Sequence, residues 1–272
     1  MLSTRLLVAV ILLPVGIAAI YAGGWIFVAV ILLVLAVAAW EYVHLFRACG
    51  LQPAGTLVIG GAALMVLGRA INQFESAGWI ISLVILASMT YHLLAYERGR
   101  DQAGTDFSIT LSGAFYTGWL GAYLVSLRQL PDGFWWIMLV LPIVWLADTG
   151  AYFIGRSMGK HRFSPRLSPK KSWEGYLAGI FFGTLGGAIL AVLWNRVAGT
   201  PLPFTPLEGA FLGLLISTLT TLGDLGESMI KRQCGLKDSS NLLPGHGGVF
   251  DRIDSWLWTA VIGYYAIVWL LI

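Results

Sequence analysis

Residues 25–46 read WIFVAVILLVLAVAAWEYVHLF, and the first 16 of them carry no charged side chain. A helix needs roughly 20 apolar residues to cross about 30 Å of hydrocarbon, so this stretch is long enough to span a membrane. The rest of the chain has the same character, because 57% of its 272 residues are hydrophobic and only 11% are charged. This composition excludes a soluble globular protein of this size and indicates an integral membrane protein.

Further apolar ranges of similar length predict an all-α, polytopic fold with about nine transmembrane helices. The ranges lie near residues 6–22, 25–46, 55–71, 78–95, 107–126, 134–155, 173–197, 207–230 and 253–272. The fifth range is the least apolar, since it contains Ser108, Thr110, Ser112 and Thr117. An eight-helix alternative makes this range re-entrant or interfacial.

The basic residues predict the orientation of the chain. On the nine-helix map, only Arg69, Arg128 and Arg196 of the 17 Lys and Arg residues fall outside the side that holds the N-terminus. Basic residues collect on the cytoplasmic side of membrane proteins, so we expect a cytoplasmic N-terminus and an inner-membrane location. The net charge is +3, and the sequence shows no extended basic and aromatic pattern that would predict nucleic-acid binding.

Polar residues divide the chain into two expected regions. Residues 1–106 form a transmembrane scaffold of about four helices, in which acids such as Glu41 stand near helix ends. Residues 107–272 form a catalytic region of about five helices, because carboxylates and cations repeatedly enter or border its spans. Cys49 and Cys234 are far apart in sequence, so neither a disulfide framework nor a cysteine metal site is expected.

Four glycines in the seventh range repeat every four residues: Gly175, Gly179, Gly183 and Gly187. Such a stripe lets another helix approach closely, and its spacing does not fit a nucleotide-binding loop. The stripe predicts helix packing, either within one protomer or between the protomers of a homodimer.

A polar stripe runs along the eighth range and ends at the basic residues that follow it. Its members recur every three or four residues and so share one helix face: Ser217, Thr220, Asp224, Glu227 and Lys231. A carboxylate close to the membrane costs free energy, which favours a functional role such as metal ligation for Asp224. The structural alternative is a pair between Asp224 and a cation of a neighbouring helix.

The segment after this stripe adds two more acids. Pro244-Gly245-His246-Gly247-Gly248 ends the helix and permits backbone conformations with positive φ. Asp251 and Asp254 then share one face at the start of the ninth range. A lone acid at this place would be explained by the helix dipole, which stabilises a negative charge there. Together with Asp224 they predict a site for one Mg²⁺ ion or for two cations, and Asp148 is a further candidate ligand in the sixth range.

The loop before the seventh range is rich in cations. Ser168-Pro169-Lys170-Lys171-Ser172 runs directly into Trp173. Ser172 is a suitable N-cap, and the free amides of a helix start attract anions. We therefore expect Lys170 and Lys171 to neutralise a bound phosphate.

The run from Ser228 to Asp254, SMIKRQCGLKDSSNLLPGHGGVFDRID, resembles the signature of the phosphatidate cytidylyltransferase (CDP-diacylglycerol synthase) family. The elements of that signature stand here at Ser228, Lys231, Arg232, Lys237, Asp238, His246, Gly247, Gly248, Asp251, Arg252 and Asp254. The family's upstream segments are matched at residues 148–152 and 168–171. The resemblance implies that CTP and phosphatidate react, with a divalent metal, to give CDP-diacylglycerol and pyrophosphate in phospholipid biosynthesis.

The resemblance and the residue chemistry together give the expected roles. Asp224, Asp251, Lys231, Lys237 and His246 are the expected catalytic residues, although His246 would either contact phosphate or only fix its loop. The expected substrate-binding residues are Ser168, Lys170, Lys171, Ser228, Arg232, Asp238, Gly247, Gly248 and Arg252. The expected metal ligands are Asp224, Asp251, Asp254 and Asp148, with Glu227 behind them. A transporter of phosphorylated solutes and a CTP-dependent polyprenol kinase remain as alternatives.

Overall fold

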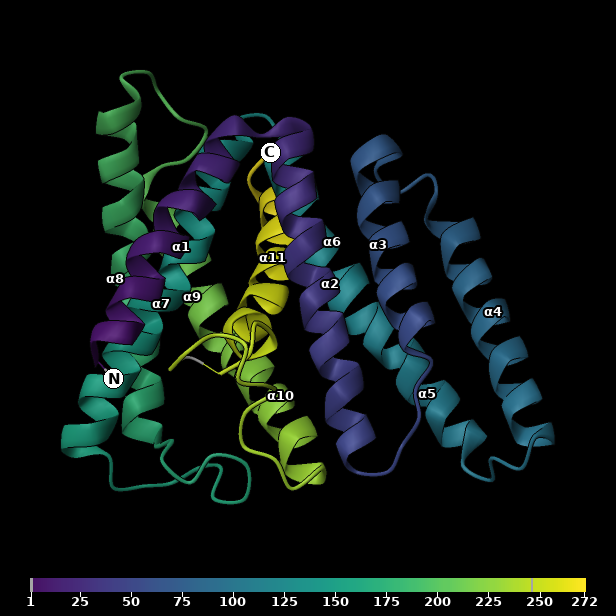
Figure 1. Ribbon diagram of the computed structural model, residues 1–272. Coiled ribbons are helices and arrows are strands. Elements are labelled where there is room, and N and C mark those ends of the chain that lie inside the picture. Colours follow the sequence, from purple (N-terminus) through teal and green to yellow (C-terminus); the bar gives the residue numbers. More distant parts are fainter. Residues whose placement is uncertain (1, 246) are drawn as a thin grey trace. The chain divides into compact units, whose positions relative to one another are not determined.

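The computed structural model describes the backbone of residues 2–245 and 247–272, and the side chains of residues 10, 12–245 and 247–272. Helices account for most of this chain (Figure 1). They are α1 (Leu2–Ala22), α2 (Gly24–Ala48), α3 (Gly55–Asn72), α4 (Ala77–Glu97), α5 (Ala103–Gly113), the π-helix η1 (Ala114–Trp119), α6 (Leu120–Gln129), α7 (Gly133–Met158), α8 (Trp173–Ala198), α9 (Pro206–Leu219), α10 (Thr221–Gln233) and α11 (Phe250–Leu270).

The predicted all-α, polytopic membrane fold is confirmed. Every predicted range is helical over most of its length. Seven helices in the described part of the chain are long and apolar enough to cross a membrane, with α9 and α10 taken together as one of them. The predicted number of nine spans and the side on which the N-terminus lies stay predictions.

The chain packs as two compact units. Unit 1 consists of Met1–Ser126 and Ile230–Ile253, and unit 2 consists of Leu127–Met229 and Asp254–Ile272. Both α10 and α11 therefore contribute residues to each unit. The functional division at residue 106 stays a prediction.

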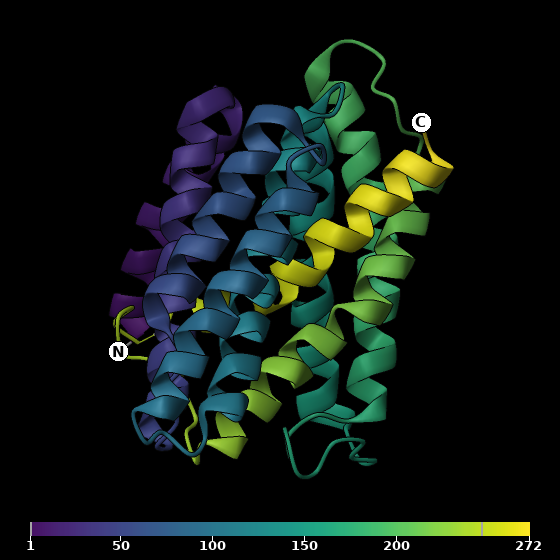
Figure 2. The ribbon, with the colours of Figure 1, turned by 90° about the vertical axis from the view of Figure 1, so that its right-hand side faces the viewer.

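Small and branched apolar side chains join the helices of unit 1. Ala39 and Val43 of α2 pack against Val58 and Ala62 of α3, and all four are buried. Figures 1 and 2 show α3 and α4 side by side, and the buried cluster that contains Met65 joins these two helices. Burial of such side chains supplies the stabilising packing that a membrane helix cannot obtain from lipid alone.

The fifth predicted range is helical throughout, from Ala103 to Gln129. Its middle section is the π-helix η1, in which backbone hydrogen bonds join residues five positions apart instead of the four of an α-helix. Thr117 donates a hydrogen bond from its hydroxyl to the Gly113 carbonyl at 2.7 Å, so this buried polar group is satisfied inside the helix.

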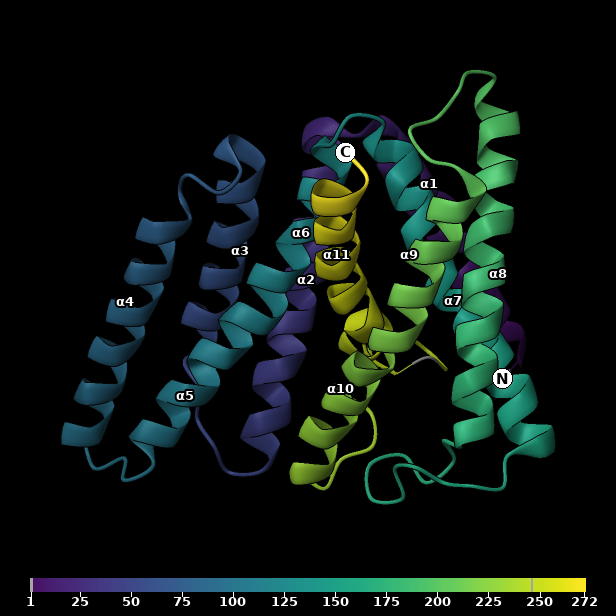
Figure 3. The same ribbon diagram turned by 180° about the vertical axis from the view of Figure 1, so that it is seen from behind.

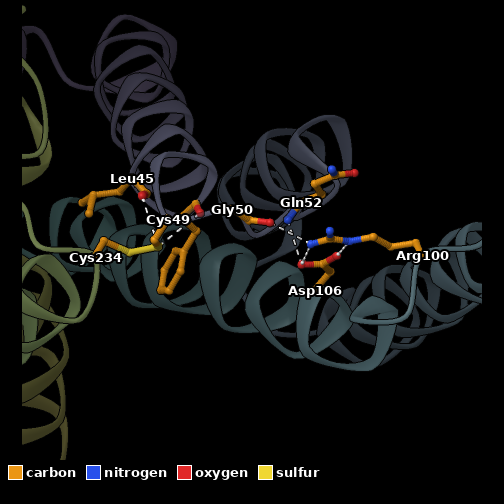
Figure 4. The surroundings of a disulfide bond; sticks show 8 residues. Leu45, Cys49, Gly50, Gln52, Arg100, Asp106 and Cys234 are labelled. Atoms are coloured by element: carbon orange, nitrogen blue, oxygen red, sulfur yellow. Dashed lines mark hydrogen bonds and ion pairs between the residues drawn. A yellow bond between two sulfur atoms is a disulfide. The ribbon is translucent and has the colours of Figure 1, made fainter.

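A polar network around Asp106 joins three segments of unit 1 (Figure 4). The Arg100 guanidinium donates to the Asp106 carboxylate at 2.7 Å, and the backbone N–H of Gln52 donates to the same carboxylate at 2.7 Å. The hydrogen bond to Asp106 raises the pKa of the Arg100 side chain. The network therefore holds the start of α5 against the segment that links α2 to α3.

The cysteine expectation was wrong. Cys49, just after α2, forms a disulfide with Cys234, just after α10, across a sequence separation of 185 residues (Figure 4). The two residues are remote only along the chain, because both belong to unit 1. The pair ties the end of α2 to the beginning of the segment that joins α10 to α11.

The glycine stripe of α8 packs against its neighbours in unit 2, as predicted for helix packing. A Cβ atom on Gly175 would lie 2.9 Å from the Ala151 carbonyl oxygen of α7, and one on Gly179 would lie 3.1 Å from the Ala147 carbonyl oxygen of the same helix. Gly187 faces Gly209 of α9. Figure 3 shows α7, α8 and α9 as neighbouring helices. The stripe is thus used within the protomer, and the homodimer stays a prediction.

The eighth predicted range lies within one candidate membrane span, Pro206–Gln233, which is divided at Thr220 into two helices. The helix α9 ends at Leu219, and α10 begins at Thr221. Ser217 and Thr220 donate hydroxyl hydrogen bonds to the carbonyls of the residues four positions earlier, at 2.5 and 2.8 Å. Such bonds compete with the backbone ladder and favour a bend or a break.

Candidate functional site

Three carboxylates come together in unit 2. One oxygen each from Asp224, Glu227 and Asp254 lies within 4.8 Å of the other two. We call these three residues the carboxylate cluster. Glu227 is 2% exposed, whereas Asp224 and Asp254 are partly exposed. Ionised carboxylates at this distance repel one another, and a hard divalent cation removes that repulsion by accepting oxygen ligands from all of them.

Gly223 brings the two helices of the cluster together. A Cβ atom at this position would lie 2.7 Å from Trp258 Cδ1 and 2.9 Å from the Asp254 carbonyl oxygen. Only glycine therefore allows α10 to pass so close to α11 at this point. The neighbouring Asp224 consequently reaches the same side as Asp254.

Lys171 supplies a cation to the cluster. Its Nζ lies 2.6 Å from Asp224 Oδ2, and the two side chains are 23% and 39% exposed. Ser228 Oγ lies 3.5 Å from the other oxygen of Asp224, Oδ1. The structural alternative for Asp224 thus has a basis, since a neighbouring cation does pair with it. This partly exposed pair brings one positive charge to the carboxylate cluster.

The start of α8 fixes the loop that carries Lys171. Ser172 is the N-cap, as predicted, and its hydroxyl accepts a hydrogen bond from the Gly175 amide at 3.2 Å. Glu174 accepts hydrogen bonds from the Lys160 amide and from His161, whose Nδ1 lies 2.6 Å from Glu174 Oε1. These contacts fix the backbone on both sides of the loop that carries Lys171.

The other basic residues of this loop remain accessible. Lys170 is exposed, and its carbonyl accepts a hydrogen bond from the Arg162 guanidinium at 2.5 Å. Ser168 lies at the start of a tight turn, because its carbonyl accepts from the Lys171 amide. An exposed ammonium beside a helix start is suited to bind an anion from the water phase.

In unit 1, Asp251 organises the segment that joins α10 to α11. We call this segment, residues 234–249, the signature loop. Asp251 Oδ1 lies 2.7 Å from Lys231 Nζ, while Oδ2 accepts from the Ser239 amide at 2.9 Å, the Ser239 hydroxyl at 3.0 Å and the Gly248 amide at 2.7 Å. These contacts show a carboxylate engaged by protein donors. Its role as a metal ligand stays a prediction.

Glu41 is the residue that the sequence reasoning missed. Its carboxylate accepts hydrogen bonds from the Ser239 and Ser240 hydroxyls at 3.3 and 2.5 Å, and from the Val249 and Phe250 amides at 3.0 and 2.6 Å. All five residues belong to unit 1. The only sequence signal was an acid near the end of the apolar stretch at residues 25–46, where Glu41 was assigned to the scaffold.

The signature loop and the first turn of α11 line an open pocket of about 550 Å³. Its lining residues are Lys237, Asp238, Asn241, Leu243, Pro244, Gly245, Gly247 and Arg252. Gly245 and Gly247 have φ values of 78° and 82°, which confirms the predicted positive φ in this loop. His246, an expected catalytic residue, lies outside the described residues. The pocket therefore unites four signature residues on a mostly polar wall.

In the described structure, two expected site residues belong neither to the carboxylate cluster nor to the pocket lining. Asp148 is exposed on α7 and is not a member of the carboxylate cluster. Arg232 is exposed on α10, and its guanidinium donates to the Leu236 carbonyl at 2.9 Å. The roles predicted for Asp148 and Arg232 stay predictions.

Comparison with known proteins places the chain in a family. The sequence profile of the cytidylyltransferase family matches residues 3–270. A protein of Pseudomonas aeruginosa named phosphatidate cytidylyltransferase is 37% identical over 99% of this chain and 97% of its own length. Proteins of the same name from Synechocystis sp. and Brucella suis are 34% and 32% identical, and the matches cover 99% and 97% of this chain and 97% and 92% of theirs. The chain therefore belongs to the cytidylyltransferase family.

Proposed function

We propose that this protein transfers the cytidylyl group of CTP to phosphatidate and releases pyrophosphate. The observation that carries this proposal is the near full-length similarity to proteins named phosphatidate cytidylyltransferase. A membrane protein with both an acidic cluster and a polar pocket suits a reaction between a lipid phosphate and a water-soluble nucleotide. We also propose an inner-membrane location with the site open to the cytoplasm, where CTP is available.

The carboxylate cluster is the proposed metal site. Asp224, Glu227 and Asp254 offer oxygen ligands, and Mg²⁺ commonly binds one or two carboxylates together with water and phosphate. A bound Mg²⁺ would neutralise phosphate charge and polarise a phosphoryl oxygen. The donor set therefore fits the metal, and Lys171 adds a fixed positive charge beside it.

Exposed cations are the proposed phosphate ligands. Lys237 and Arg252 line the pocket of unit 1, where their charges would bind the phosphate chain of CTP. Lys170 and Arg232 are exposed and would bind a phosphate of either substrate. Lys231 is engaged by Asp251, so its proposed part is to keep the signature loop in place.

The proposed reaction needs alignment more than it needs a base. A phosphate oxygen of phosphatidate is already anionic; it forms a bond to the α-phosphorus of CTP while the bond to the β-phosphate oxygen breaks. The protein's task is to hold the two phosphates in line and to stabilise the negative charge of the departing pyrophosphate. Lysine and arginine side chains supply that charge stabilisation without a proton transfer.

The proposal is tested by incubating the purified protein with CTP, Mg²⁺ and phosphatidate. We expect CDP-diacylglycerol by mass spectrometry and an equal amount of pyrophosphate. Omission of any one component should remove both products. Release of pyrophosphate without phosphatidate, or consumption of phosphatidate without CTP, would contradict the proposed reaction.

A further inference from the structure

Glu41 is buried, and both oxygens of its carboxylate accept hydrogen bonds. Oε1 accepts from the Ser240 hydroxyl and the Val249 amide, and Oε2 accepts from the Ser239 hydroxyl and the Phe250 amide. The residue is 0% exposed. A buried carboxylate is tolerated only when its oxygens are hydrogen-bonded. Here Oε1 has two donors of its own, whereas Oε2 has the Phe250 amide and shares the single Ser239 hydroxyl proton with Asp251 Oδ2.

These four donors stand on either side of the pocket-lining part of the signature loop. Ser239 and Ser240 immediately precede the segment 241–247, and Val249 and Phe250 follow it. Glu41 thus joins the two ends of that segment from a helix almost 200 residues earlier in the chain. Because Phe250 is the first residue of α11, the carboxylate also satisfies a free amide at a helix start and complements the helix dipole.

Gly248 makes the close approach of Glu41 possible. A Cβ atom on Gly248 would lie 2.6 Å from Glu41 Oε2 and 2.7 Å from Oε1, which is closer than a methyl group can come. This glycine of the signature is therefore matched to the acid at residue 41. The backbone N–H of Gly248 also donates a hydrogen bond to Asp251 Oδ2, which adds a further anchor to the loop.

The geometry points to Glu41 as a positioning residue for nucleotide binding. It holds Ser239 next to Lys237 and Asp238, and it holds the first turn of α11, from which Arg252 reaches the pocket. This inference rests on the proposed function, since it takes the pocket to be the site for CTP. It assigns a role in substrate binding to a residue outside the signature and far from it in sequence.

The decisive variant is Glu41→Gln, which keeps the shape and removes half of the acceptors. The amide NH₂ of Gln would face one serine hydroxyl, which can turn to accept, and one backbone N–H, which cannot, so the hydrogen bond from Val249 or from Phe250 is lost. We expect the KM for CTP to rise about 10- to 100-fold, in keeping with the loss of charged hydrogen bonds. The KM for phosphatidate should change less than about twofold, because the loop anchors lie at the nucleotide pocket. Glu41→Asp, which keeps both oxygens and the charge, should restore part of the affinity for CTP.

Two further variants keep the test decisive. Ser240→Ala removes a single donor to Glu41 and should raise the KM for CTP about 3- to 10-fold even if Glu41→Gln does not fold. Glu97→Gln is the matched control, since Glu97 is exposed at the end of α4, and it should behave as wild type. An unchanged KM for CTP in Glu41→Gln and Ser240→Ala, with turnover falling only as the folded fraction falls, would overturn the positioning role.

Amide hydrogen exchange separates this inference from the proposed function. In Glu41→Gln, the Val249 or the Phe250 amide loses its acceptor, and that amide should exchange at least about tenfold faster, whether or not the protein acts on CTP. Faster exchange in a protein without cytidylyl transfer would refute the proposed function and keep the loop anchor. Cytidylyl transfer with unchanged exchange and unchanged KM would refute the inference alone.

Discussion

Lys171 Nζ lies 2.6 Å from Asp224 Oδ2, which links the loop before α8 to the first turn of α10. The sequence placed these residues in separate motifs, one expected to bind phosphate and the other to bind metal. Their contact shows that the two motifs meet within unit 2. A lysine beside three carboxylates lowers the repulsion among them, and it places a cation next to the proposed Mg²⁺ site.

Asp224→Asn and Asp254→Asn should each lower turnover about 100-fold or more, because each removes a carboxylate from the proposed metal site. Mn²⁺ binding, followed by electron paramagnetic resonance, should weaken by at least about tenfold in both variants. The matched control is Asp101→Asn, which changes an exposed acid of the loop between α4 and α5. Wild-type Mn²⁺ affinity in either cluster variant would move that acid to a structural role.

Lys171→Met separates the functional reading of Asp224 from the structural one. The pair is partly exposed, so its loss should cost less than about 1 kcal/mol of stability. Turnover should nevertheless fall about tenfold, because a positive charge beside the phosphates is lost. Equal changes in stability and normal turnover for Lys171→Met and Asp224→Asn would indicate a purely structural ion pair.

Gly223→Ala should push α10 away from α11. The added methyl group would meet Trp258 and the Asp254 carbonyl, and such overpacking costs roughly 1–3 kcal/mol. We expect a lower thermal midpoint, weaker Mn²⁺ binding and reduced turnover together. Gly60→Ala is the control, since a Cβ atom there meets nothing within 4 Å. Wild-type Mn²⁺ binding in Gly223→Ala would show that the cluster does not depend on this approach.

The disulfide predicts the number of reactive thiols. Denatured wild-type protein should bind no maleimide before reduction and two maleimides after it, because Cys49 pairs with Cys234. Replacement of both by Ser should lower stability by about 2–4 kcal/mol, the usual effect of losing such a cross-link. Two labels on unreduced, freshly isolated protein would show that the pair is open in the cell.

Local patterns predicted the helices and much of the acidic cluster. Apolar length is a property of a contiguous stretch, so each expected range became helical. The spacing of Asp224 and Glu227 puts them on one helix face. Asp254, near the start of α11, lies close to both of them. The same periodicity predicted the span that α9 and α10 form together, but it did not predict the break at Thr220.

Long-range pairs were beyond the sequence. Nothing near Glu41 marks it as different from an ordinary acid at the end of a membrane helix, since its partners are almost 200 residues away. The pairing of Cys49 with Cys234 was missed for the same reason. Both contacts depend on how α2 packs, and packing partners of lipid-embedded helices are set by shape rather than by a local pattern.

The most direct test of cytidylyl transfer follows the phosphates of CTP. Purified protein is incubated with Mg²⁺, phosphatidate and CTP radiolabelled at either the α- or the γ-phosphate, and the lipid product is then extracted. The proposed reaction predicts that the α-label enters the lipid and the γ-label leaves as pyrophosphate. Transfer of the γ-label to the lipid would identify a kinase, and retention of both labels in CTP would leave no cytidylyl transfer to explain.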